Sequence, residues 1–423
     1  MESRPGLRVR GGRHGAALAL IRGLVRRNAT ELGNFWVDLT RCVLRVLLPL
    51  AVVAGLVFVA LGVQQNLTGA QTVTTLGGGQ QTLTGGPVGS WESIKLMSGD
   101  GGGFFNASSS HPLENPSATT NALSIVLMLL VPTAFLRTYG RMVGSLRQGW
   151  TLLAVVGILF GLLLAAGSLA QSTHTGTVTE AVGGAYEGVE TRIGVPGSTL
   201  FGVAATASAD GALNSSYDSF SALGGGVLLA GMMLGEIAPG GTGSGLYGLL
   251  MVTMVAVFLG SLMVGRTPEF LGKRLGAGEM RYVVLYSLVG PATILVSASL
   301  AMALGHGQSS MTNTGSHRLT EVVYAYTSVV NSNGSAMAGF NGAIDFHNLL
   351  MTAAMLIGRY LPIAFLLALA RRLARQEPGA VTAGTLQARG ATFVLLATAA
   401  AVLLTLLNFL PVLSLGPLAE GLM

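Results

Sequence analysis

Residues 90–107 have the sequence SWESIKLMSGDGGGFFNA, a semi-polar segment that ends in a run of glycines. Two segments of the same kind follow, STLFGVAATASADGALNSSYDSF at 198–220 and RLTEVVYAYTSVVNSNGSAMAGF at 318–340, with Gly101, Gly211 and Gly334 at matching places. Each begins with about one or two helical turns, too few to cross a bilayer. Non-helical backbone survives at membrane depth only where it lines a watery cavity or is buried in protein, so the pattern predicts re-entrant pore loops.

Long apolar runs flank these segments. Half of the 423 residues are hydrophobic, only 10% are charged and the mean hydropathy is +0.61, so a soluble globule would lack polar surface. A membrane-crossing helix needs about 20 apolar residues. Pro239 and the glycines after it interrupt one long run, which we therefore expect to be broken in the middle. The predicted spans are 36–62, 116–136, 149–170, 222–264 (the broken one), 282–304, 346–370 and 390–412.

These patterns predict an all-α membrane protein of about seven transmembrane helices, with three span–pore loop–span repeats and one accessory C-terminal helix. Residues 1–27 are rich in arginine, and we expect a cytoplasmic N-terminal tail, with a cleaved transit peptide as the alternative. The expected repeats are 28–147, 148–280 (with a broken second helix) and 281–376. Residues 377–423 are expected to hold the accessory helix and the C-terminus.

Basic residues gather in four clusters between the apolar runs. All four fall on one side if the spans alternate, and the positive-inside rule makes that side the cytoplasm. We therefore expect the N-terminus inside, the C-terminus outside, and no nucleic-acid partner despite the formal charge of +6. The single Cys42 excludes an intrachain disulfide. The clusters are Arg22, Arg26 and Arg27; Arg137, Arg141 and Arg147; Arg266, Lys273, Arg274 and Arg281; and Arg371, Arg372, Arg375 and Arg389.

The glycine-containing strands are candidates for an ion filter. A selectivity filter replaces the water around a cation with backbone carbonyl oxygens, and glycine lets such a strand adopt positive φ. The polar residue before each matched glycine can brace the strand or add negative potential. Any one such strand could instead be an ordinary polar loop, but three at matched positions favour a filter. The candidate residues are Gly99, Asp100, Gly101 and Gly102; Ala209, Asp210 and Gly211; and Ser332, Asn333 and Gly334.

Three charged residues are candidates for gating or for a pore charge. Arg359 lies in the middle of a span, where an arginine costs roughly 2.5–3.5 kcal/mol on insertion scales. We expect a fixed positive charge below the filter, with an internal ion pair or snorkelling as the alternative. Glu236 lies where the broken span is interrupted, either satisfied at a kink or part of a gate. Arg266 follows that span, as a membrane anchor or the partner of the gate.

Motifs for nucleotide chemistry do not fit. Residues 243–248 match G-x-G-x-x-G, but no strand precedes them and no acidic residue follows about 20 positions on. The chain contains neither G-x-x-x-x-G-K-[ST] nor D-K-T-G. We expect no nucleotide to bind to this chain and no ATP hydrolysis by it.

Longer stretches resemble a known family. GGGFFNASSSHPLENP (101–116), YDSFSALGGG (217–226), GEIAPGGTGSGLYG (235–248), GRTPEFLGK (265–273) and NSNGSAMAG (331–339) are similar to signature stretches of KdpA, the A subunit of the bacterial potassium-transporting Kdp ATPase. The resemblance implies the fold of the superfamily of K+ transporters, K+ as the ion held by the filter carbonyls, and membrane lipid around the chain. It implies a complex with a KdpB-type P-type ATPase subunit and KdpC-type and KdpF-type small subunits in the bacterial inner membrane.

The family pattern has four span–loop–span units, and this chain starts close to the second. We expect it to lack the first repeat. The expected function is K+ binding and translocation as the non-catalytic subunit of an ATP-driven uptake complex. A non-conducting remnant or assembly module and a Trk- or Ktr-like transporter that works without an ATPase are the alternatives.

Overall fold

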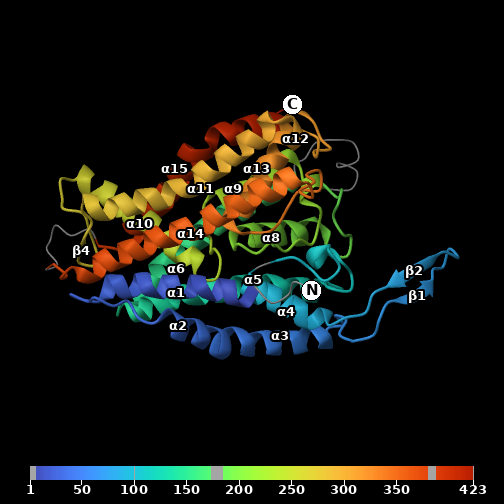
Figure 1. The fold of residues 1–423 in the computed structure, drawn as a ribbon, viewed down its shortest axis with the longest axis horizontal. Helices are drawn as coiled ribbons and strands as arrows, with labels where there is room; N and C mark the ends of the chain where they lie inside the picture. Colours follow the sequence, from blue (N-terminus) through green and yellow to red (C-terminus); the bar gives the residue numbers. More distant parts are fainter. Residues whose placement is uncertain (1–5, 100, 173–183, 380–386, 423) are drawn as a thin grey trace.

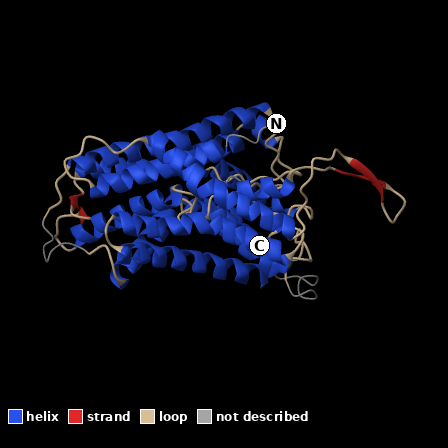
Figure 2. Ribbon diagram, turned by 90° about the horizontal axis from the view of Figure 1, so that it is seen from below, coloured by secondary structure: helices blue, strands red, loops and turns tan. Residues whose placement is uncertain are grey.

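The computed structural model describes residues 6–99, 101–172, 184–379 and 387–422. Long helices lie side by side in a bundle, and a two-stranded hairpin projects from one end of it (Figures 1 and 2). Within the described residues, seven helices are long and apolar enough to cross a membrane, which confirms the predicted number of spans. They comprise Phe35–Ala60, Ala118–Met142, Leu146–Ser172, Ser244–Met263, Ala277–Ala303, Asp345–Arg375 and Ala391–Gly421.

Three span–loop–span units follow one another along the chain. In each, a short helix and a non-helical strand lie between the spans, as the repeated pattern predicts. The first unit consists of α2 (Phe35–Cys42), η1 (Val43–Leu47), α3 (Leu48–Ala60), β1 (Gln71–Thr74), β2 (Gln80–Leu83), α4 (Val88–Ser98), η2 (Ser108–Ser110) and α5 (Ala118–Met142). The second consists of α6 (Leu146–Ser172), α8 (Gly194–Ala207), η3 (Tyr217–Ser219), α9 (Ala222–Met233) and α10 (Ser244–Met263).

The third unit and the accessory helix complete the bundle. A short antiparallel pair, β3 with β4, joins the second unit to the third. The remaining elements are β3 (Glu269–Phe270), β4 (Lys273–Arg274), α11 (Ala277–Ala303), α12 (Gly305–Gln308), α13 (Gly315–Asn331), α14 (Asp345–Arg375), α15 (Ala391–Leu413), η4 (Ser414–Leu418) and α16 (Ala419–Gly421). The hairpin β1–β2 is exposed along its whole length.

The predicted break in the fourth span is confirmed. Helix α9 ends at Met233 and α10 begins at Ser244, with a turn-rich segment between them that we call the break loop (residues 234–243). The cause is local backbone geometry, because Gly235, Glu236, Gly240 and Gly243 all have positive φ. A right-handed helix cannot continue through such residues.

The N-terminal segment differs from the predicted tail. Residues Gly6–Val25 form a helix, α1, which packs against α14. Five of its apolar side chains lie on one face at helical spacing and are at most 3% exposed: Ala16, Ala17, Leu20, Ile21 and Leu24. Buried polar side chains, Arg13 and His14, share this side of the helix, so a count of apolar residues does not reveal that it packs inside the protein.

Close packing of α1 against α14 gives a prediction about stability. A Cβ on Gly23 would lie 2.5 Å from Ala370 O and 2.9 Å from Ala370 Cα, whereas one on Gly157 in α6 would meet nothing within 4 Å. We expect Gly23→Leu to destabilise the protein by about 1–3 kcal/mol, the usual cost of overpacking. Thermal unfolding of the detergent-solubilised chain measures it, with Gly157→Leu as the matched control. Equal unfolding midpoints for the two variants would contradict the packing described.

Candidate functional site

The three short helices α4, α8 and α13 end in the same way. Each is followed by a residue in the left-handed region: Gly99 (φ 68°), Ala209 (φ 59°) and Ser332 (φ 61°). Asp210 and Asn333 then make the same turn, because Asp210 Oδ1 accepts a hydrogen bond from Ala212 N and Asn333 Oδ1 accepts one from Ser335 N, each at 3.1 Å. The sequence match among the three segments is therefore also a match of backbone geometry.

The three strands meet at their matched glycines. A Cβ built on Gly101 would lie 2.3 Å from Gly211 Cα, and one built on Gly211 would lie 2.8 Å from Gly334 Cα and 2.5 Å from Asn333 O. Backbones that approach this closely leave no room for a side chain. Strands that are more than one hundred residues apart in the sequence are thus brought together at one place, which we call the glycine junction (Gly101, Gly211 and Gly334).

Buried side chains brace the second and third strands. The Tyr217 hydroxyl donates to Ala212 O at 3.1 Å, and the Tyr324 hydroxyl lies 2.8 Å from Ser335 Oγ. Asn333 Nδ2 donates to Ala205 O at 3.0 Å, which joins the third strand to α8. The first bond holds a strand carbonyl that has no partner in a regular helix or sheet, and the other two hold side chains of the third strand in place.

A buried ion pair braces the first strand. Lys95 Nζ lies 2.6 Å from Glu92 Oε2 and donates to Gly102 O at 2.7 Å, while Ser109 Oγ donates to Glu92 Oε1 at 2.6 Å. The side chains of Lys95 and Glu92 are 4% and 0% exposed. Because the two charges compensate each other, the lysine can hold a strand carbonyl without adding net charge beside the glycine junction.

Glu114 supports the same strand from the following loop. It is fully buried and accepts a hydrogen bond from Phe104 N. Burial raises its pKa to about 7, because the surrounding protein disfavours the charged form, and the nearby Glu92 acts in the same direction. Lys95 and the backbone N–H groups oppose this shift without cancelling it.

The break loop closes the space behind the strands. Gly240 N donates to Ala207 O at 2.9 Å and Thr242 Oγ1 donates to Ser98 O at 3.3 Å, so the loop contacts the C-terminal ends of both α8 and α4. The C-terminus of a helix carries partial negative charge. Three such ends lie around the glycine junction, and together they favour a cation.

Arg13 joins α1 to this region. It is 5% exposed, and its guanidinium donates to Asn331 O at 3.3 Å and to Ser244 Oγ at 3.4 Å. A positive charge at the C-terminus of α13 is stabilised by the helix dipole. Arg359, predicted as the charge below the filter, lines a lateral cavity between α1, α2 and α14 that Arg13 also lines.

The other predicted charges lie apart. Glu236 is 2% exposed in the break loop and lines a cavity of about 150 Å³ together with Ser244, Asn331 and Asn408. Arg266 is exposed beyond the far end of α10. The 20 residues of that helix correspond to about 30 Å, so the structure does not bring Arg266 to Glu236 as the partner of a gate. Asp100 lies outside the described residues.

Comparison with known proteins identifies the family of the chain. The family model for the potassium-transporting ATPase A subunit matches residues 14–422. The chain belongs to that family.

Curated relatives agree with the family match. Proteins named potassium-transporting ATPase potassium-binding subunit are 48% identical over 406 residues in Kineococcus radiotolerans and 49% identical over 406 residues in Streptomyces coelicolor, in both cases over 96% of this chain and 73% of the relative. One from Frankia alni is 50% identical over 391 residues, 92% of this chain and 67% of the relative.

Several bracing residues of this A subunit are absent from the sequence prediction. A signal in the sequence could have identified Glu92 and Lys95. They stand at i and i+3 in a short, largely apolar helix, and charged side chains are rarely buried unless they pair with each other. Arg13 carries no such signal, since it lies among other arginines.

The buried pair predicts a strong effect of removing one charge. We expect Lys95→Met to destabilise the protein by about 3–5 kcal/mol, because Glu92 would remain as an uncompensated buried carboxylate. The double variant Glu92→Gln with Lys95→Met should recover part of this loss. Thermal unfolding of the two variants and of Glu92→Gln alone completes the cycle. If the double variant loses as much stability as the two single variants together, Glu92 and Lys95 are not coupled.

The raised pKa of Glu114 predicts a pH dependence. A carboxyl group with a folded-state pKa above its unfolded value contributes stability that is fully present below the unfolded pKa and is lost as pH rises through the folded pKa, here about 7. We expect Glu114→Gln to lose less stability than the natural protein between pH 5 and pH 8. Unfolding midpoints across that interval measure it. The same pH profile in both proteins would count against this assignment.

Proposed function

We propose that this chain binds K+ on backbone carbonyl oxygens and passes it across the membrane as the non-catalytic subunit of an ATP-driven uptake complex. The filter consists of Gly99–Gly102, Ala209–Gly211 and Ser332–Gly334. A partner P-type ATPase subunit hydrolyses ATP, and this chain binds no nucleotide.

The glycine junction is the observation that carries the proposal. Three strands with matched left-handed exits approach one another at Gly101, Gly211 and Gly334. Repeated strands that share one geometry present their carbonyl groups in a repeated way, which is the requirement for replacing the hydration shell of a cation. The helix C-termini behind the strands add negative potential at the same place.

The break loop supplies a gate in this proposal. It lies against the ends of α4 and α8, and the cavity beside it is lined by Glu236 and by hydroxyl and amide groups. A volume of about 150 Å³ accommodates several waters, so a rehydrated cation fits there. The ion passes from the filter, around the loop, into this cavity, with Glu236 as its counter-charge.

Basic clusters support a membrane orientation. Lys273 Nζ donates to Arg26 O at 2.6 Å, and Ala29 N donates to Ala374 O at 2.9 Å, so three of the basic clusters gather at one end of the bundle. That end lies opposite the β1–β2 hairpin (Figure 1). By the positive-inside rule it faces the cytoplasm of a bacterial cell, with the filter toward the outside of the inner membrane. The partners are KdpB-type, KdpC-type and KdpF-type subunits.

Substitution at the glycine junction tests the proposal. A Cβ on Gly211 would enter the space of Asn333 O and the Gly334 backbone, so Gly211→Ala displaces the strand. An overpacking cost of about 1–3 kcal/mol, with 1.4 kcal/mol for each factor of ten, predicts a loss of K+ affinity of about 5-fold to 100-fold. K+-stimulated ATP hydrolysis and Rb+ uptake by the reconstituted complex measure it.

Gly157→Ala is the matched control, because its Cβ meets open space in α6, and it should leave the affinity unchanged. Wild-type K+ affinity in the Gly211→Ala complex would rule out the filter. A natural complex that assembles but takes up no Rb+ would identify the chain as an assembly module. Uptake by the chain without the ATPase would point to an independent transporter.

A further inference from the structure

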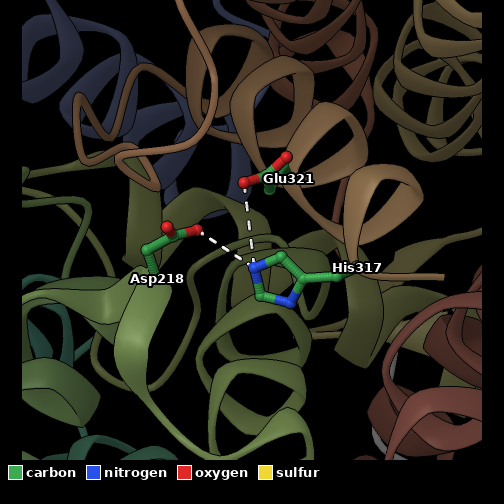
Figure 3. A group of neighbouring side chains, drawn as sticks. All are labelled: Asp218, His317 and Glu321. Atoms are coloured by element: carbon green, nitrogen blue, oxygen red, sulfur yellow. Dashed lines mark hydrogen bonds and ion pairs between the residues drawn. The ribbon is translucent and has the colours of Figure 1, made fainter. Parts of the chain in front are cut away.

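A histidine lies among three carboxylates near the start of α13, well away from the glycine junction. His317 Nε2 is 3.2 Å from Asp218 Oδ1 and 3.7 Å from Glu321 Oε1, and His317 Nδ1 is 2.9 Å from Glu420 Oε1 (Figure 3 shows the first two contacts). The four residues come from η3, α13 and α16, so the fold assembles the cluster from separate parts of the chain.

The cluster carries an excess of negative charge. Within the part of the chain that the structure describes, no lysine or arginine lies within ion-pair distance of the three carboxylates, and His317 is their one basic neighbour. Glu321 is fully buried; its Oε1 atom faces His317, while its Oε2 atom points away from the ring (Figure 3) and has no hydrogen-bond partner among the described residues. One histidine can compensate at most one of the three carboxylates, and burying uncompensated charge costs free energy, so the arrangement favours a further bound positive charge.

The ligand atoms have the spacing of a small metal site. Nε2 of His317 and the nearest oxygens of Asp218 and Glu321 all lie within 4.8 Å of one another. Zinc binds histidine nitrogen and carboxylate oxygen at about 2.0–2.2 Å in tetrahedral geometry, which separates neighbouring ligand atoms by roughly 3.3–3.6 Å. The two measured separations from Nε2, 3.2 and 3.7 Å, bracket that value.

Glu420 completes the pattern from the other side of the ring. A histidine that binds a metal through one nitrogen commonly donates its other N–H to a carboxylate, which fixes the tautomer and the ring orientation. The contact between His317 Nδ1 and Glu420 Oε1 fulfils this role and leaves Nε2 directed at Asp218 and Glu321. Asn313 Nδ2 holds Glu321 Oε1 at 2.6 Å in the same way.

We propose that His317, Asp218 and Glu321 form a binding site for a divalent transition metal of the zinc type, with Glu420 as the residue that orients the histidine. The side chains of His317 and Asp218 are 23% and 17% exposed, so a metal ion in solution can reach them. The site is separate from K+ binding. A bound metal would tie η3, which follows the second filter strand, to α13, which precedes the third.

Metal binding to the purified chain tests this inference. The tag-free chain in detergent is treated with a chelator, dialysed and titrated with Zn²⁺, and with Co²⁺ as a spectroscopic probe. We expect one metal per chain, a visible Co²⁺ absorption band typical of tetrahedral coordination, and a higher unfolding midpoint with Zn²⁺. His317→Gln and Glu321→Gln should each abolish all three. Absence of stoichiometric binding by the natural chain would overturn the proposal.

Two further variants separate a specific site from incidental binding. Glu420→Gln should keep the stoichiometry but weaken affinity by about 10–100-fold, the usual effect of an outer-shell partner. His111→Gln is the matched control, since His111 lies in another surface loop and should not affect binding. Wild-type binding by a folded His317→Gln chain would assign the metal elsewhere and refute the site. Rb+ uptake by the chelator-treated complex is a separate measurement. If the metal site is refuted, the proposal for K+ binding therefore still stands or falls on its own test.

Discussion

Irregular backbone inside an apolar helical bundle has to find hydrogen-bond partners, and this requirement governs the centre of the molecule. The strands around Gly101, Gly211 and Gly334 depart from helical geometry where water is scarce. Their polar groups are satisfied by tyrosine, serine and lysine side chains from the adjoining short helices and loops. The spans supply an apolar surround, and the short helices supply both the bracing groups and their negative ends.

The broken helix belongs to the same arrangement. Positive φ at Gly235, Glu236, Gly240 and Gly243 ends the helix, and the loop then donates to the last carbonyls of α4 and α8, through the Thr242 hydroxyl and the Gly240 N–H respectively. Carbonyls at a helix end lack intrahelical partners, so the loop supplies hydrogen-bond donors to carbonyl groups that α4 and α8 leave without intrahelical partners. Movement of this loop would therefore cost hydrogen bonds to both α4 and α8.

Much of this architecture is predictable from the sequence. Hydropathy gives the spans because a bilayer sets their length, and the matched glycines identify the strands because few other residues permit their close approach. Contacts between distant segments are not predictable in this way. Arg13 reaches α13 across more than three hundred residues, and Asp218, His317 and Glu420 become neighbours only after folding. The buried side of α1 mixes apolar residues with Arg13 and His14, and its place against α14 depends on Gly23 and Ala370 fitting together.

The equivalent turns at Asp210 and Asn333 differ in one chemical respect. Both side chains accept a hydrogen bond from the backbone two residues on, but only the amide can also donate, and Asn333 uses that capacity toward Ala205. In a channel assembled from identical subunits, every copy of a residue changes at once. Pseudo-symmetric repeats within a single polypeptide are free of that coupling, so evolution can adjust the charge and stiffness of each repeated strand separately.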